Sequence, residues 1–329
     1  MNPTRRKLLN LAMGAAALSR TCRVALAEAY PTRPIRLVVP FPPGGAFDAV
    51  GRPWADKMKA LLGTVVVENI GGAGSSLGAA AVARANPDGY TLLLGGSIPH
   101  VNEAILKSRP MYDPLKDLQP ISNIVSAAFA IAIHPSVPVH TLKDLVAYAK
   151  ANPDGLSYGS PGVGTLPHLT VELLKSLAGT PDIRHVPYRG AGPALTDLIS
   201  GQIQMFSASV TGQVLELHRS NRLRILAVTS AARLIAAPEL PTAAEMEFPR
   251  LTAPHHIGLL APSGTPGAII DQIAQATRMA LAEPTYRALL VEGCFEPDVD
   301  SNPDKFRRLL EEDVARWTPI VNALALKIN

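Results

Sequence analysis

Four glycine-bearing turns hold the residues with the clearest capacity for chemistry. They span residues 42–48, 71–76, 159–165 and 188–192, and each lies between an apolar, strand-like run and a helical stretch. Glycine lets the backbone approach a ligand closely, and the first turn of a helix presents amide groups without intrahelical acceptors, at the positive end of the helix dipole. Such helix starts bind anions. Each turn alone could equally be a simple strand-to-helix connection, but four together favour an anion site.

The elements around these turns predict an α/β fold with mostly parallel sheets, because apolar strand-like runs alternate with helical stretches. Loops that follow parallel strands lie at the carboxyl ends of the strands, so we expect the four turns to converge on one crevice. The predicted strands are Ile35 to Val39, Thr64 to Glu68, Tyr90 to Leu94, Phe129 to Ile133, Arg184 to Val186, Ile203 to Phe206, Leu223 to Thr229 and Ile257 to Ala261.

Three helices have clear start signals. Thr141 and Asp144 form a predicted capping box ahead of an apolar helical face. Thr265-Pro266 and Asn302-Pro303 mark two further starts, since proline suits the first turn of a helix. The residues predicted to be buried in these last two helices are Ile269, Ile270, Ile273, Thr277, Leu281, Phe306, Leu309, Leu310, Val314 and Trp317.

The first 27 residues predict an export signal. They carry five basic and no acidic residues, an apolar run from Leu8 to Leu18, and small residues that offer a cleavage site near Ala27. Arg5-Arg6 directly before the run indicates a twin-arginine signal, and an arginine-rich Sec signal is the alternative. The run is too short for a retained transmembrane anchor, and the residues before Cys22 do not fit a lipoprotein signal. We expect a periplasmic protein.

The charge and composition of the chain exclude some classes of partner and ligand. The whole chain has a formal net charge of +4, and removing a leader with five positive and no negative charges leaves the mature chain at −1, so we expect no nucleic-acid partner. Cys294 is then the sole mature cysteine and cannot form an internal disulfide. The 329 residues are 47% hydrophobic, enough for two lobes, and only 5% aromatic, which argues against a sugar-binding cleft.

Enzyme and cofactor motifs are weak. The segment 72–78 is near a dinucleotide fingerprint, but its third glycine comes one residue late. We expect no Gly-x-Ser-x-Gly nucleophile elbow, no His-Glu-x-x-His and no phosphate-binding glycine loop that ends in lysine. His255 and His256 are adjacent, so they point in different directions, and no carboxylate or cysteine cluster accompanies them as metal ligands. We expect a binding protein with no cofactor and no metal, and an exported enzyme is the less favoured alternative.

Several long motifs occur in order along the mature chain. They are Pro40-Phe41-Pro42-Pro43-Gly44-Gly45 with Asp48, Val66-Val67-Glu68-Asn69 followed by Gly72-Ala73-Gly74, Pro87 to Leu93, Tyr112-Asp113-Pro114, His185 to Gly190, and Pro193 to Leu198. With these motifs the chain resembles the Bug family, the periplasmic substrate-binding receptors of tripartite tricarboxylate transporters. The resemblance implies a type II periplasmic-binding-protein fold with two lobes of mixed, mostly parallel sheets and a two-crossover hinge.

The expected lobes comprise residues 28–128 with 254–329, and residues 129–253. The resemblance also implies a monomer whose lobes close around a small carboxylate, such as a dicarboxylate, tricarboxylate, amino acid or aromatic acid. The closed form would present a surface to permease subunits in the membrane, and a sensor protein is the alternative partner. Closure of this kind follows when a ligand makes contacts with both lobes that exist only in the closed state.

The resemblance assigns ligand binding to thirteen positions. For Asp48, two roles stay open: favourable charge in the first helical turn, or contact with a ligand ammonium or amide group. For His168 we favour capping or packing over ligand contact. Departures from the family pattern at His255-His256, Gly96 and Pro161 leave the ligand's identity open. The thirteen positions are Phe41, Pro43, Gly44, Gly45, Asp48, Ser97, Ser160, Gly162, Gly164, Thr165, His168, Tyr188 and Ser209.

Overall fold

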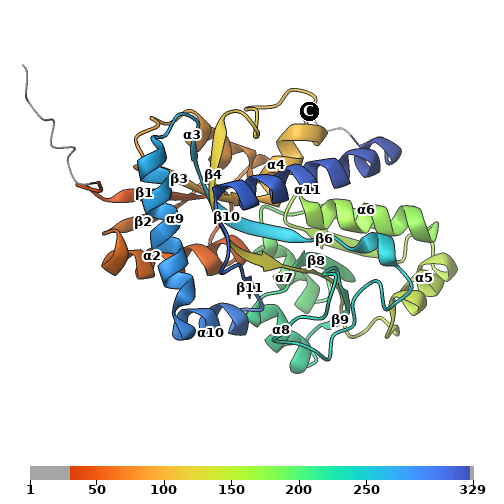
Figure 1. The fold of residues 1–329 in the computed structure, drawn as a ribbon. Coiled ribbons are helices and arrows are strands. Elements are labelled where there is room, and N and C mark those ends of the chain that lie inside the picture. The colour runs from red at the N-terminus through yellow and green to blue at the C-terminus, as the bar shows by residue number, and fades with distance from the viewer. Residues whose placement is uncertain (1–29, 327–329) are drawn as a thin grey trace, which may run out of the picture. The chain divides into compact units, whose positions relative to one another are not determined.

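Two mixed β-sheets form the framework of the chain (Figure 1). The computed structural model describes residues 30–326, so the predicted export signal and Cys22 lie outside the described residues. The first sheet has the strand order β11-β4-β10-β3-β1-β2 and the second β7-β6-β8-β5-β9. In chain order the strands are β1 Ile35–Val39, β2 Val65–Asn69, β3 Thr91–Gly96, β4 Leu118–Ala127, β5 Phe129–Ile133, β6 Ser157–Ser160, β7 Arg184–Pro187, β8 Met205–Ser209, β9 Arg224–Val228, β10 His255–Pro262 and β11 Glu296–Pro297.

Parallel pairing occurs at the strands that precede the glycine turns. In the first sheet β1 pairs in parallel with β2 and β3, and in the second β6 pairs in parallel with β7 and β8. The strands that carry the chain between the sheets, β4, β5, β9 and β10, pair antiparallel with their neighbours. The expectation of mostly parallel sheets is therefore too strong, because direct strand-to-strand crossovers add antiparallel pairs.

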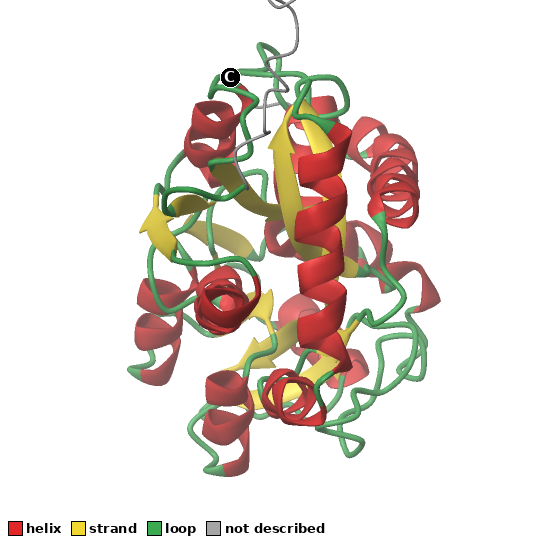
Figure 2. Ribbon diagram, turned by 60° about the vertical axis from the view of Figure 1, so that its left-hand side comes forward, coloured by secondary structure: helices red, strands yellow, loops and turns green. Residues whose placement is uncertain are grey.

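Helices lie on both sides of the strands (Figure 2). The capping box that opens α5 is confirmed: the Asp144 amide donates to Thr141 Oγ1, and the Thr141 amide donates back to the Asp144 carboxylate. The helices are α2 Ala46–Leu61, α3 Ser76–Ala83, α4 Ser97–Val101, α5 Leu142–Ala151, α6 Leu166–Ala178, α7 Ala191–Ile199, α8 Gly212–Arg219, α9 Gly267–Ala282, α10 Pro284–Glu292 and α11 Pro303–Ala323, with short η1 Ala73–Ser75, η2 Asn102–Leu106 and η3 Pro249–Leu251.

The predicted buried faces of α9 and α11 are largely confirmed. Ile269, Leu309 and Val314 are only partly buried, and the other predicted residues are buried. Asp313 on α11 is also buried, and an apolar pattern cannot predict this because the residue is charged.

The second sheet separates two apolar cores. Ala130 and Ala132 of β5 contribute to one core, together with α7 and α8, while Ile131 and Ile133 contribute to the other, with α5 and α6. This alternation follows from the two-residue period of a strand. Cys294, which precedes β11 of the first sheet, is buried in the core beneath α7 and α8.

All eight predicted strands are present, but β4, β6 and the two-residue β11 are missed. Polar residues and Pro120 interrupt the apolar pattern of β4, and β6 has the composition Ser-Tyr-Gly-Ser. In β6 the Ser157 hydroxyl is buried and donates to Gln204 Oε1 at 2.9 Å. Satisfied hydroxyls allow a polar segment to be buried in a sheet, and a hydrophobicity pattern does not detect this.

The two crossovers between the sheets meet at Thr229. β4 passes directly into β5 at Ala128, and the chain returns from β9 to β10 through residues 229–254. The Thr229 hydroxyl accepts from the Phe129 amide at 3.0 Å and donates to the Ala253 carbonyl at 3.2 Å. In the main chain, the Thr229 amide donates to the Phe129 carbonyl at 3.0 Å, and the Thr229 carbonyl accepts from the Ala253 amide at 2.8 Å. One buried residue thus ties both crossover segments together.

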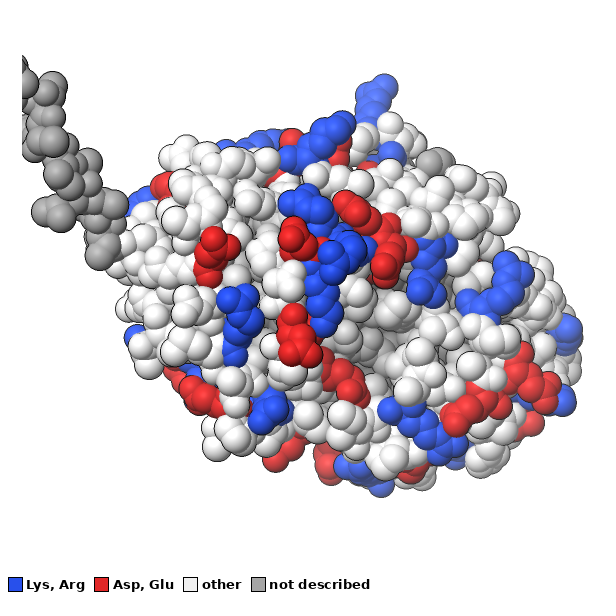
Figure 3. Space-filling view, viewed as in Figure 1, with Lys and Arg blue, Asp and Glu red and all other residues white. Residues whose placement is uncertain are grey.

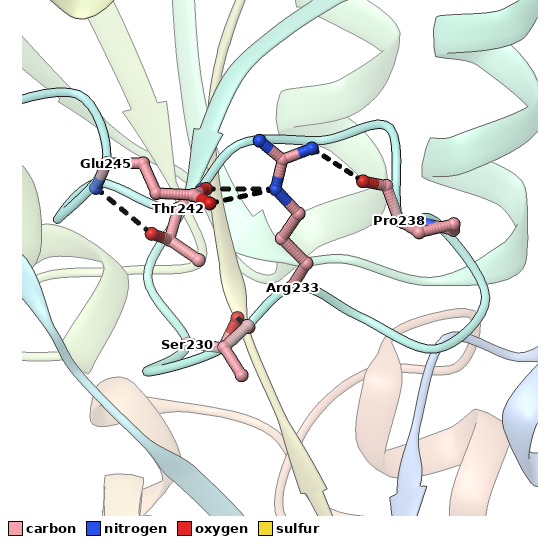
Figure 4. Close-up of polar contacts among 6 residues, drawn as sticks. Ser230, Arg233, Pro238, Thr242 and Glu245 are labelled. Carbon is pink, nitrogen blue, oxygen red and sulfur yellow. Dashed lines mark hydrogen bonds and ion pairs between the residues drawn. The ribbon is translucent and has the colours of Figure 1, made fainter.

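The return segment is held by a polar cluster shown in Figure 4. Arg233 Nε lies 3.0 Å from both carboxylate oxygens of Glu245, and its Nη1 donates to the Pro238 carbonyl at 2.8 Å. Glu245 also accepts from the Thr242 amide at 2.7 Å. The Ile235 amide donates to Glu296 on β11 at 3.1 Å, which connects this segment to the first sheet.

The surface carries no continuous patch of one charge on the face shown in Figure 3, where basic and acidic side chains are interspersed. Several are paired, such as Arg219 with Glu239 at 2.8 Å. Among the described helices, we find none with the length and apolar character that a membrane span requires.

We predict that Thr229→Val destabilises the fold by about 1–3 kcal/mol, because it leaves a buried amide and a buried carbonyl without their hydroxyl partner. Thr229→Ser keeps the hydroxyl and should recover most of the loss. Urea unfolding of both variants measures this. Equal stability of the valine variant and the parent would show that the hydroxyl does not stabilise the crossovers.

Candidate ligand-binding cleft

The first glycine turn opens α2 without a side-chain cap. Gly45 is the N-cap, no side chain bonds the first amides of the helix, and the first intrahelical bond runs from Ala49 to Gly45. A Cβ added to Gly44 or Gly45 would meet no atom within 4 Å, so space adjoins both residues. The amides at the start of α2 therefore lack intrahelical acceptors and lie beside a chamber.

This inner chamber lies between the two sheets and is partly open to solvent. The first lobe contributes 41–47 and Ile98. The second lobe contributes the starts of α7 and α8, residues from β8 and two prolines from the turn at α6. Its second-lobe residues are Pro161, Pro167, Gly190, Ala191, Gly192, Pro193, Leu195, Phe206, Ala208, Ser209, Thr211, Gln213 and Val214.

A larger outer groove adjoins the inner chamber. It is lined by residues 71–75 and Lys107 of the first lobe and by residues 161–163 and 187–190 of the second, and it shares Phe41, Pro42 and Pro43 with the inner chamber. A Cβ added to Gly190 would lie 3.3 Å from the Pro42 ring, so the two lobes approach closely where the two spaces meet. All four glycine turns thus line one interlobe space.

Asp48 does not face the chamber with a free carboxylate. Its oxygens accept from Arg52 Nε at 2.9 Å, Asn69 Nδ2 at 3.1 Å and the Gly44 amide at 3.2 Å. Burial opposes ionisation, but hydrogen bonds from Arg52, Asn69 and Gly44 outweigh it and lower the pKa of Asp48. The geometry favours the helix-start role of Asp48 over contact with a ligand ammonium group.

The hydroxyls of the turn 159–165 shape the backbone. Ser160 Oγ lies 2.7 Å from His185 Nε2 and donates to the Gly162 carbonyl at 3.2 Å, and Thr165 Oγ1 donates to the same carbonyl at 2.8 Å. The Gly164 amide donates to His168 Nδ1 at 3.2 Å. These residues hold the turn in place and are not exposed on the chamber wall.

His168 belongs to a buried stack in the second lobe. Its ring lies 4.3 Å from the His185 ring, which lies 4.6 Å from the Tyr158 ring. Burial lowers the pKa of His168 to about 4 and that of His185 to about 3, so both are neutral at physiological pH. The bond from the Gly164 amide makes His168 a capping residue, which agrees with the favoured alternative.

Ser97 and Ser209 connect the chamber to β10. Ser97 Oγ accepts from the His256 amide at 2.8 Å, and Ser209 Oγ lies 3.2 Å from His255 Nδ1. The His255 ring packs 4.8 Å from Phe129 and 5.5 Å from Phe47. Burial raises the pKa of Asp313, which faces Ser97, to about 7. His255 Nδ1 and Asp313 thus have serine partners, whereas His255 Nε2 and Asp313 Oδ2 are buried without a hydrogen-bond partner. Among the described residues, no group of His, Cys, Asp and Glu could hold a metal.

The thirteen predicted positions thus fall into three groups. Phe41, Pro43, Gly44, Gly45 and Ser209 line the inner chamber, while Gly162 and Tyr188 line the outer groove. The Tyr188 hydroxyl donates to Asp197 at 2.6 Å and is held against α7. The remaining six support the walls: Asp48, Ser97, Ser160, Gly164, Thr165 and His168.

The apolar wall of the chamber was not predicted. Ile98, Phe206 and Val214 line the inner chamber but belong to no motif, and Pro193, which does belong to one, was not assigned to the ligand. The expectation that the chain has no Gly-x-Ser-x-Gly motif is wrong at the level of spacing, because the spacing occurs at 74–78 and 155–159. Neither serine is a nucleophile elbow: Ser76 Oγ donates to Glu103, and Ser157 Oγ donates to Gln204 within β6. Neither is paired with a histidine base.

We predict that Gly74→Ala keeps the lobes apart. Its Cβ would lie 2.8 Å from the Val163 carbonyl of the other lobe and 2.9 Å from Asn102 Nδ2. Small-angle scattering should give a larger radius of gyration than for the parent protein. Gly179→Ala is the matched control, because Gly179 has nearly the same φ, +64° against +66°, and no atom within 4 Å of the added Cβ. An unchanged radius for Gly74→Ala would contradict the proposed contact.

We predict acid sensitivity from His255. Burial, with a smaller contribution from His256, lowers the pKa of His255 in the folded state from 6.5 to about 3. The unfolded chain therefore binds a proton that the folded chain does not, and stability that is complete above pH 6.5 is lost as the pH falls towards 3, by about 1.4 kcal/mol per pH unit. Urea unfolding at pH 7.5 and pH 5 measures the loss. His255→Phe should reduce it, and an unchanged loss would assign the sensitivity elsewhere.

Comparisons with known proteins agree with this geometry. Residues 50–326 match the family model described as "Tripartite tricarboxylate transporter family receptor". The periplasmic binding protein BugD has 31% sequence identity, a TM-score of 0.85, and coverage of 91% of this chain and 99% of its own. MatC of Rhodopseudomonas palustris with bound malate has 29% sequence identity and a TM-score of 0.84, and the match covers 89% of this chain and 100% of MatC.

A second R. palustris protein, solved with adipate, has 30% sequence identity and a TM-score of 0.86, and the match covers 91% of this chain and 99% of the other. These similarities extend over both lobes, and the matched structures share the two-sheet, two-lobe periplasmic-binding-protein fold. The chain therefore belongs to the tripartite tricarboxylate transporter family of solute-binding receptors, whose members are binding proteins and not enzymes.

Proposed function

We propose that this receptor works in the periplasm, where it binds a small carboxylate between its lobes and delivers it to the permease subunits of a tripartite transporter. The observation that carries the proposal is the uncapped start of α2, which opens onto the inner chamber from one lobe while the uncapped start of α7 lines it from the other. Helix starts stabilise anions through amide hydrogen bonds and the helix dipole.

Relatives support the ligand class. MatC was solved with malate and another relative with adipate, and both are carboxylates. In this chain a neutral amide cradle would hold one carboxylate without a direct salt bridge, which favours reversible binding. The predicted export signal, with cleavage near Ala27, supports the periplasmic location.

Closure of the lobes would signal occupancy. The predicted lobes, 28–128 with 254–329 and 129–253, would move about the two crossovers joined by Thr229. A ligand that contacts both α2 and α7 stabilises the closed arrangement relative to the open one. Ligand-saturated protein should therefore have a smaller radius of gyration in solution than the free protein.

We predict that Ala46→Pro weakens carboxylate binding without unfolding the protein. Ala46 is the first residue of α2, and Gly45 has extended φ and ψ of −93° and −179°, a conformation that suits the residue before a proline. The substitution removes one amide donor from the cradle and no intrahelical hydrogen bond.

A thermal-shift screen over dicarboxylates, tricarboxylates, amino acids and aromatic acids identifies a ligand that stabilises the parent protein. The shift should shrink by at least half in Ala46→Pro at equal ligand concentration, while the melting temperature without ligand stays within a few degrees. A full shift in the variant would contradict a role for the α2 amides.

A further inference from the structure

The wall of the inner chamber carries no charged side chain. Of the residues that line it, Ser209, Thr211 and Gln213 have polar side chains, and all three are neutral. The other lining residues are apolar or glycine, with aromatic rings from Phe41, Phe47 and Phe206. The Phe41 and Phe47 rings lie 4.9 Å apart in a tilted arrangement beside the start of α2.

The amide donors are concentrated at one end of this chamber. No proline lies between Gly45 and Asp48, so the start of α2 keeps every amide of its first turn. Elsewhere donors are fewer. In α7 the Gly190 amide donates to the Pro161 carbonyl at 3.2 Å and Pro193 has no amide hydrogen, which leaves Ala191 and Gly192.

The first turns of α6 and α8 also have fewer amide donors available to a ligand. Pro167 removes one amide hydrogen from the first turn of α6, and the Val214 amide of α8 donates to Thr211 Oγ1 at 3.3 Å. The strongest position for a carboxylate is therefore the start of α2, and the remainder of the chamber is predominantly apolar.

Within the inner chamber a second charge on the ligand would find no counter-charge, and the cations Lys107 and Arg189 line the adjoining outer groove instead. The nearest acid to the α2 start, Asp48, already accepts from Arg52, Asn69 and Gly44. An ammonium group in the chamber would lose its hydration without gaining a carboxylate partner, and a second carboxylate would gain no cation. An apolar or aromatic group instead gains from burial against phenylalanine and proline side chains.

We propose that the ligand is a monocarboxylate with an apolar, aromatic body and no ammonium group. Its carboxylate binds at the amides of α2, and its ring lies against Phe41, Phe47 and Phe206. This inference rests on the proposed function, because it assigns a chemical class to the same cleft. It excludes α-amino acids, hydroxy-dicarboxylates and tricarboxylates as preferred ligands.

Isothermal titration of the mature protein tests the proposal, with benzoate and phenylacetate as probes against malate, citrate and L-glutamate. The aromatic monocarboxylates should bind at least about tenfold more tightly than each of the other three. Tighter binding of malate, citrate or glutamate would overturn the inference and leave the proposed function intact. If none of the five binds and none changes the radius of gyration, the proposed function fails as well.

A charge insertion provides a second test. Gln213 is exposed and lines the chamber, so Gln213→Lys introduces a cation at its wall on the surface of α8. Relative to the parent protein, the variant should gain several-fold more affinity for terephthalate than for benzoate. Gln202→Lys is the matched control, because Gln202 is exposed in the same lobe and does not line the chamber. An equal gain in both variants would overturn the proposal.

Discussion

The amides at the start of α2 have no partner within the helix and no side-chain cap, and the cleft is arranged around them. Gly45 offers no side chain to cap them, and the Asp48 carboxylate, which could have turned towards them, is held by Arg52 and Asn69. The backbone donors consequently remain directed to the space between the lobes. Every other feature of the cleft either encloses this space or positions the turn that opens it.

The proposed closure requires two lobes that meet closely and can also separate. The backbone contact between Gly74 and Val163, and the packing of Gly190 on Pro42, bring main chain against the other lobe with no intervening side chain. On the hinge side, Thr229 joins both crossovers and His255 packs between Phe129 and Phe47. Tight backbone contacts at the cleft and a hydrogen-bonded hinge behind it are features expected of a receptor that closes around its ligand.

Sequence reasoning predicted the framework because the framework is periodic. Strand alternation, the capping box at Thr141 and the proline starts of helices are local signals, and the glycine turns mark the same strand-to-helix junctions that line the cleft. The missed strand β6 is polar in sequence, and its burial depends on Gln204, 47 residues away from Ser157. A long-range partner of this kind leaves no local pattern.

The structure pairs several of the predicted site residues within the fold. Resemblance placed Ser160 and Thr165 at the ligand, whereas their side chains hold the turn through Gly162 and His185. His168, for which capping or packing was favoured, accepts from the Gly164 amide. The apolar wall of Ile98, Phe206 and Val214 comes from three separate elements and is visible only after folding. Side-chain roles depend on which groups are already paired, and pairing is a property of the tertiary structure.

The most direct test of the central claim is a titration of ¹⁵N-labelled protein with a bound carboxylate, followed by amide chemical shifts. We expect the largest downfield proton shifts at Gly45, Ala46 and Phe47, because a carboxylate that accepts from these amides deshields their protons. Smaller shifts are expected at Ala191 and Gly192. If these five amides stay unchanged while the ligand binds and shifts other resonances, the carboxylate is held elsewhere and the start of α2 is not its site.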